Sequence, residues 1–132
     1  MNILVTGYKG FIGKNLIFFL KNNKNFKVFK YGKKNSLKDL KNYVQKSDII
    51  FHLAGENRNN LNKEFLKNNV YITKNIIKFT KRKNNKTLII YASTNQINKK
   101  NNIYTQTKIL AENYLKKNSN KMVSVKIYRF TN

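Results

Sequence analysis

Tyr104 and Lys108, in the segment NIYTQTK (102–108), are four residues apart near the predicted start of a helix. Residues at this spacing lie on one helix face. A free phenol has a pKa near ~10, too high for easy proton exchange at neutral pH, and an ammonium one turn away would lower it. The pair could therefore act as a proton donor. With 8 Tyr and 25 Lys in 132 residues, roughly one or two such pairs are expected by chance. The pair therefore indicates catalysis only if other motifs in the sequence support it.

A glycine loop near the amino terminus is the first of these supporting motifs. Gly7, Gly10 and Gly13 occur in TGYKGFIG, directly after the apolar run NILVT (2–6) and at the start of a helical segment. In such a loop the first glycine permits a tight turn, the second lets the backbone approach a pyrophosphate, and the third lets the helix pack closely on the sheet. The helix N-terminus adds free N–H groups and a positive dipole end. The pattern predicts a phosphate-binding loop.

Strand-like and helix-like segments alternate along the whole chain. This alternation predicts an α/β fold of parallel strands joined by right-handed crossovers, in a single domain over residues 1–132. The last strand alternates apolar and polar residues, which indicates that only one of its faces is covered and that it lies at the edge of the sheet. The predicted strands are 2–6, 26–31, 48–55, 86–93 and 122–130, and the predicted helices are 11–22, 36–46, 62–82 and 103–118.

The net charge of +23 raises the question of a nucleic-acid partner. Asparagine, with 24 copies, is nearly as frequent as lysine, and both residues have A-rich or A/T-rich codons. The lysines are spread along the chain rather than clustered. These observations favour compositional bias over a selected polyanion surface, and we expect only nonspecific nucleic-acid binding at low salt.

The chain contains no cysteine, so it has no disulfide or thiolate metal site, and no metal is expected. Its start lacks the pattern of a signal peptide, and the longest apolar run, 16–20, is too short to span a bilayer. These features predict a cytoplasmic protein. His52, the only histidine, falls on a predicted core strand and is expected to be structural.

Six motifs, in the correct order, resemble the extended branch of the short-chain dehydrogenase/reductase superfamily, also called the NAD-dependent epimerase/dehydratase family. The glycine loop has the spacing of this branch, Thr-Gly-x-x-Gly-x-x-Gly. The other five are DIIFHLAG (48–55), NNVYITKNII (68–77), STNQI (93–97), YTQTK (104–108) and YRFTN (128–132). The resemblance implies a Rossmann-like, doubly wound sheet and an NAD(P)-dependent oxidoreductase or epimerase.

The resemblance also assigns roles. Tyr104 and Lys108 resemble the catalytic pair, and a positively charged nicotinamide would further favour the phenolate. Thr94 is the expected hydroxyl that holds the substrate carbonyl, with Ser93 as the alternative. Asn69, which interrupts an apolar helical stripe, resembles the asparagine that supports the lysine through water.

The cofactor is expected to be NADP, with NAD as the less favoured alternative. NAD sites carry an acid about 20 residues beyond the glycine loop, whereas NADP sites carry a base. Here Lys33 and Lys34 occupy that region, and no acid precedes Lys38. The expected cofactor-binding residues are Gly7, Gly10, Phe11, Ile12, Gly13, Lys33, Lys34, Leu53, Ala54, Gly55, Tyr104 and Lys108.

Within the family, the segment HLAGENRNNLNKEF (52–65) resembles the reductase domain of capsular polysaccharide enzymes that reduce a 4-keto UDP-sugar. The short gap before this segment matches as well and implies five strands in the order 2-1-3-4-5. Arg58 and Asn132 are the expected substrate-binding residues. Dehydration is disfavoured because Asn95 and Gln96 stand where dehydratases of this branch carry an acidic pair.

Family members are considerably longer, and the portion that would bind the sugar is not present in these 132 residues. We therefore expect a truncated product or half of a split enzyme, with weak nucleotide binding and slow or no turnover alone. The expected partners are a nucleotide sugar and either a second copy of the chain, as a homodimer, or a separate chain carrying the substrate domain. An epimerase and a non-catalytic dinucleotide- or polyanion-binding fragment stay open as alternatives.

Overall fold

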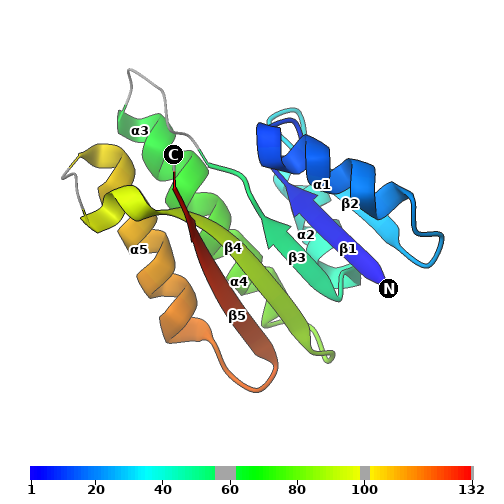
Figure 1. Cartoon of the computed structure of the whole chain (residues 1–132). Helices are drawn as coiled ribbons and strands as arrows, with labels where there is room; N and C mark the ends of the chain where they lie inside the picture. Colours follow the sequence, from blue (N-terminus) through cyan, green and yellow to red (C-terminus); the bar gives the residue numbers. More distant parts are fainter. Residues whose placement is uncertain (56–61, 99–101, 132) are drawn as a thin grey trace.

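A computed structural model describes residues 1–55, 62–98 and 102–131. Its centre is a five-stranded parallel sheet in the order β2-β1-β3-β4-β5, as the resemblance implied. The strands run side by side in Figure 1, with β5 at one edge. Their bounds are β1 Asn2–Thr6, β2 Lys27–Tyr31, β3 Ile49–His52, β4 Thr87–Thr94 and β5 Val123–Phe130.

The helices cover the two faces of the sheet unequally. Helices α2, α4 and α5 pack with the sheet around the larger buried cluster, which includes Leu40, Ile76 and Leu115. On the other face, α1 is the one helix among the described residues, and it lies over a smaller cluster around Val5 and Ile17 (Figure 1). Their bounds are α1 Phe11–Lys21, α2 Leu37–Lys46, α4 Ile72–Thr80 and α5 Ile103–Asn118.

Two helix starts are fixed by reciprocal side-chain capping. At α2, Ser36 accepts from the Asp39 amide while the Asp39 carboxylate accepts from the Ser36 amide. At α5, Asn102 and Thr105 form the same arrangement. Such boxes satisfy amides that have no partner within the helix. The box at Asn102 fixes where α5 begins and so places Tyr104 in its first turn.

The helix predicted over 62–82 is not one α-helix. It is divided into α3 (Asn62–Phe65), a π-helical segment η1 (Leu66–Tyr71) and α4. A π segment accommodates an extra residue in one turn without ending the helix. The helix expected here is therefore confirmed, with a π-helical segment that the spacing did not predict, and it ends at Thr80.

The edge position expected for the last strand is confirmed, since β5 pairs only with β4 in the described sheet. Beside α1, the open face of the sheet carries a shallow apolar depression of about 250 Å³, lined in part by Leu16, Phe51, Ile90 and Tyr128. None of the helices among the described residues is both long enough and apolar enough to cross a membrane.

Candidate active site

The glycine loop connects β1 to α1 and turns at Gly7, whose φ is +69°. A side chain at this position would have its Cβ 2.7 Å from the Ala54 amide nitrogen, so both the backbone angle and the space require glycine. The Gly7 amide donates to the Tyr31 carbonyl (3.0 Å), and the Gly10 amide donates to the Gly7 carbonyl (3.0 Å). The loop is therefore held by the carboxyl ends of both neighbouring strands.

Gly13 permits a close approach of α1 to the glycine loop. A Cβ at Gly13 would lie 2.5 Å from the Gly7 carbonyl oxygen and 2.7 Å from the Tyr8 Cα. At Gly13 the helix therefore lies directly against the backbone of its own loop. Gly10 is the N-cap residue and makes no side-chain cap, so the first amides of α1 are left for another acceptor.

Two pockets lie on either side of the glycine loop and share Gly7, Gly10, Leu53 and Gly55. The β2-side pocket, of about 480 Å³, extends towards the end of β2 and includes Lys33 and Ala54. The β4-side pocket, of about 630 Å³, extends towards the ends of β4 and β5. The β4-side pocket also contains the predicted residues Phe11, Ile12, Gly13, Thr94, Tyr104 and Lys108.

The two catalytic candidates on α5 and the threonine on β4 therefore face one pocket. A hydrogen bond with the Thr94 side chain acts on the half-buried Tyr104 phenol and lowers its pKa, but burial outweighs it, and the net pKa of Tyr104 is raised. Lys108 is not among the groups that shift this pKa. The phenol therefore keeps its proton at neutral pH, and the lowering of its pKa expected from the ammonium together with a charged nicotinamide stays a prediction.

The position of the Lys108 ammonium explains why it does not lower the pKa of Tyr104. Its Nζ donates to the Ala92 carbonyl (2.7 Å) and lies 4.5 Å from the centre of the Tyr91 ring. The side chain is 5% exposed, and burial lowers its pKa to about 8, while the charge of Glu112 acts in the opposite direction. Lys108 is thus directed at the sheet, in a place where its charge is costly.

We expect Lys108→Met to make the chain more stable by about 1 kcal/mol near pH 7. Keeping the buried lysine protonated costs about 3 kcal/mol, since its pKa falls from 10.5 to about 8 on folding. Loss of the hydrogen bond to Ala92 offsets about 1–3 kcal/mol of that gain. The cost is complete below pH 8 and disappears as pH rises towards 10.5, so the advantage of the variant should shrink between these values.

Urea unfolding at pH 7, 8, 9 and 10 measures this effect. Lys116→Met is the matched control, because Lys116 is on the same helix with its side chain 58% exposed. This control should change the free energy of unfolding little at any of these pH values. A Lys108→Met variant that is less stable than the wild type throughout would contradict the expectation.

Asn69 lies in the π-helical segment and is fully buried. Its Nδ2 donates to the Thr107 hydroxyl (3.0 Å). Gly55 makes room beside it, because a Cβ on Gly55 would be 3.1 Å from the Asn69 Oδ1 and 3.4 Å from the Lys108 Nζ. Asn69 and Lys108 therefore approach the same small space, and π segments occur frequently at functional sites.

Ser93 remains the alternative to Thr94, because both side chains are buried and both face the β4-side pocket. The Ser93 hydroxyl makes no hydrogen bond of ordinary geometry, although it lies close enough to Glu112 to lower the pKa of that carboxylate. Thr94 acts on the Tyr104 phenol and accepts from the Gln96 amide (3.2 Å). This contact favours Thr94 as the partner of Tyr104.

Some predicted residues are not placed in either pocket. Lys34 is exposed and does not line the β2-side pocket, whereas its neighbour Lys33 does. Arg58 and Asn132 lie outside the described residues, so their roles stay predictions.

The sequence did not predict several residues that line the β2-side pocket, among them Lys9, Asn35, Lys67 and Tyr71. Lys9 lies inside the glycine motif, at a position where the motif accepts any residue. Lys67 and Tyr71 lie in or at the end of the π segment, where ordinary helical spacing does not indicate which face points to the loop. On the other side, Phe130 and Thr131 at the end of β5 complete the β4-side pocket.

His52 is completely buried and joins three elements. One ring nitrogen, Nδ1, pairs with the Thr6 hydroxyl (2.9 Å), and the other, Nε2, pairs with the Thr73 hydroxyl (2.8 Å). Thr6 also accepts from the Ala54 amide (3.1 Å), and Thr73 donates to the Asn69 carbonyl (2.8 Å). The structural role expected for this histidine therefore includes holding the glycine loop, the end of β3 and the π segment in register.

A family model described as the NAD dependent epimerase/dehydratase family matches residues 3–132. UDP-2-acetamido-2,6-beta-L-arabino-hexul-4-ose reductase from Pseudomonas aeruginosa is 31% identical over 115 residues, which are 87% of this chain and 31% of that protein.

Two solved structures are similar over almost the entire chain. The capsular polysaccharide assembling protein CapF from Staphylococcus aureus has a TM-score of 0.82 at 30% identity, covering 100% of this chain and 34% of that one. UDP-glucuronic acid 4-epimerase from Bacillus cereus, in complex with NAD, has a TM-score of 0.82 at 19% identity, covering 99% and 57%, and this likeness shows the fold alone. The chain thus spans between about a third and somewhat over half of the length of these proteins.

Proposed function

Because the chain belongs to the NAD dependent epimerase/dehydratase family, we propose that it is the cofactor-binding and catalytic part of an NADP-dependent reductase of a 4-keto nucleotide sugar. The proposal rests chiefly on one arrangement: Thr94, Tyr104 and Lys108 line the same pocket as the glycine loop. The similarity to the Pseudomonas reductase supports the substrate class, and the similarity to CapF supports a role in surface polysaccharide synthesis.

The residues around the loop suit a dinucleotide. The left-handed Gly7 and the uncapped start of α1 at Gly10 leave backbone amides for a pyrophosphate. The two pockets on either side of the loop provide one space for each half of the cofactor. When bound, a reduced nicotinamide supplies the hydride.

The residues of the chain then carry out the proton transfer. Tyr104, whose raised pKa keeps it protonated, donates this proton to the substrate oxygen. Thr94, which acts on the phenol already, orients the carbonyl. Lys108 stabilises the phenolate that forms, with Asn69 beside it across Gly55. Each of these roles is an interaction that strengthens as charge develops.

Selectivity for NADP is supported by charge in the β2-side pocket. Lys9, Lys33 and Lys67 are among its lining residues, and no Asp or Glu is among those described. A 2′-phosphate would gain from these ammonium groups, whereas the ribose hydroxyls of NAD would lack the usual carboxylate.

Titration with NADPH and with NADH, followed by nicotinamide fluorescence, tests the proposal. We expect the wild type to prefer NADPH. Lys33→Glu should weaken NADPH binding by at least about tenfold, because it places a negative charge beside the 2′-phosphate, and it should leave NADH binding nearly unchanged.

Lys34→Glu is the matched control for this experiment. It makes the same change in net charge one residue away, at an exposed position outside the pocket. Equal losses in the two variants would indicate a general charge effect rather than a 2′-phosphate site. Absence of binding for both nucleotides in the wild type would refute the proposed function.

A further inference from the structure

A buried carboxylate lies one helical turn beyond Lys108. Glu112 is 2% exposed, in a chain with 28 basic and only 5 acidic residues. Glutamate is rarely buried to this extent unless it is paired. The proposed chemistry does not use this residue, so its position requires a separate explanation.

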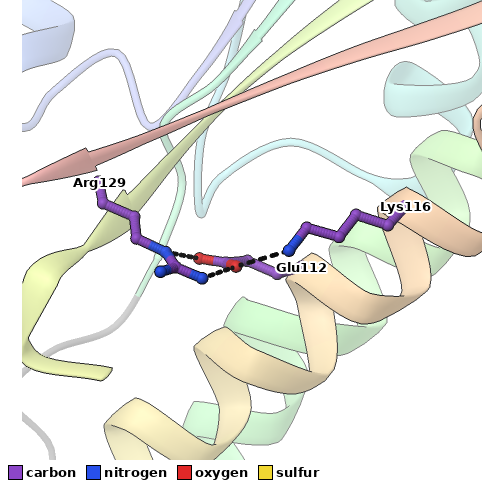
Figure 2. A network of polar contacts seen from close by, with 3 residues as sticks. All are labelled: Glu112, Lys116 and Arg129. Carbon is purple, nitrogen blue, oxygen red and sulfur yellow. Dashed lines mark hydrogen bonds and ion pairs between the residues drawn. The ribbon is translucent and has the colours of Figure 1, made fainter. Parts of the chain in front are cut away.

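The partner of Glu112 comes from the edge strand β5. Arg129 on β5 donates from Nε to Oε1 (3.0 Å) and from Nη2 to Oε2 (2.7 Å) of Glu112. Figure 2 shows the guanidinium facing the carboxylate, with Lys116 reaching it from further along α5. Two parallel bonds make the Arg129 contact strong. The Lys116 contact, at 3.6 Å from an exposed side chain, is weak.

This pair joins the catalytic helix to the end of β5. Arg129 is opposite Ser93 in the sheet register, and Phe130 is opposite Thr94. The strand end that carries Arg129 continues into Phe130 and Thr131, which line the β4-side pocket. The two bonds thus fix one wall of that pocket relative to α5, on which Tyr104 and Lys108 stand.

The charge of Glu112 also reaches Lys108. The described groups near the ammonium include the Ala92 carbonyl, the Tyr91 ring and, across Gly55, Asn69. The charge of Lys108 also acts on His52, but burial lowers the pKa of His52 to about 3, so its ring is neutral. Glu112 is the carboxylate that favours the charged form of Lys108, against burial.

We propose that Glu112 and Arg129 form a positioning pair for the catalytic lysine: the pair holds α5 against the end of β5, and Arg129 limits the negative charge that Glu112 presents to Lys108. This inference rests on the proposed role of Lys108. Neither Glu112 nor Arg129 lines the pockets that would hold the cofactor.

The test compares Glu112→Gln with Arg129→Met by titrating the Lys108 ammonium with ¹⁵N NMR, its signal being assigned by its loss in Lys108→Met. Glu112→Gln should lower the pKa of Lys108 below about 8, because the stabilising carboxylate is gone. Arg129→Met should raise it, because the carboxylate is no longer neutralised by the guanidinium. A purely structural clamp would not produce opposite shifts.

Lys116→Met is the control and should leave the Lys108 pKa nearly unchanged, since its contact with Glu112 is weak and exposed. If Arg129→Met does not fold, Arg129→Gln removes the same charge with less loss of polar contact, and the same upward shift is expected. Shifts in the same direction for Glu112→Gln and the Arg129 variant, or no shift in either, would overturn the inference. Failure of the wild type to bind NADPH would refute the proposed function instead, and the charge coupling would still be measurable.

Discussion

Gly13→Ala should destabilise the chain by at least about 2 kcal/mol, a large part of the stability of a domain of this size. The added Cβ would lie 2.5 Å from the Gly7 carbonyl oxygen and less than 3 Å from two backbone atoms of Tyr8. The backbone of the glycine loop cannot move aside. The Gly7 amide donates a hydrogen bond to the Tyr31 carbonyl, and Gly7 itself packs against the backbone of Ala54. Overpacking against backbone should cost about 3 kcal/mol, the upper end of its usual range. Alanine is better than glycine within a helix by about 1 kcal/mol, so a net loss of about 2 kcal/mol or more remains.

Gly10→Ala is the matched control, since its Cβ would meet only the Gly7 carbonyl, at 3.3 Å. Thermal unfolding followed by circular dichroism should show a much smaller fall in Tm for Gly10→Ala than for Gly13→Ala. Nucleotide binding should nevertheless be weakened in Gly10→Ala, because a methyl group would separate the backbone from the pyrophosphate. Equal Tm values for Gly13→Ala and the wild type would show that the loop and helix are not packed as described.

Much of the fold could be predicted because its signals are local. The apolar run 2–6 became β1 with the predicted bounds, and the pattern of 103–118 became α5. The alternation within 122–130 indicated an edge strand, which β5 is. Each of these signals depends on side chains that a strand or helix must bury on one face, and such patterns survive even a strong bias towards lysine and asparagine.

The parts that could not be predicted depend on contacts between distant segments. The sequence did not reveal the π segment around Asn69, because apolar residues at steps of three and four are equally compatible with one continuous α-helix. Lys33 and Lys34 are equivalent as sequence, and only the turn after β2 directs the first towards the pocket.

The spacing of Tyr104 and Lys108 was informative about position but not about electrostatics. It placed both residues in one pocket. It did not indicate that the ammonium would bond to the Ala92 carbonyl or that burial would determine the pKa of the phenol. The lowering of the Tyr104 pKa expected with a charged nicotinamide stays a prediction for the complex.

The chain should lose stability steeply in acid because of His52. Burial, with a smaller contribution from the charge of Lys108, lowers the pKa of His52 from 6.5 to about 3. The folded state therefore keeps the ring neutral while the unfolded state takes up a proton. The stabilising contribution is complete above pH 6.5 and falls by up to about 1.4 kcal/mol per pH unit as pH drops towards 3.

His52→Gln isolates this contribution. An amide can bond to the Thr6 or Thr73 hydroxyl but does not titrate. At pH 7 we expect the variant to be less stable than the wild type by about 1–3 kcal/mol, since part of the buried hydrogen bonding is lost. Urea unfolding at pH 7, 5.5 and 4 should show this deficit shrinking and then reversing, because only the wild type is penalised in acid. A constant deficit at all three values would mean that folding does not change the pKa of the ring. That result would be incompatible with its burial between Thr6 and Thr73, and with the register that these bonds impose on Ala54 and Asn69 beside the proposed active site.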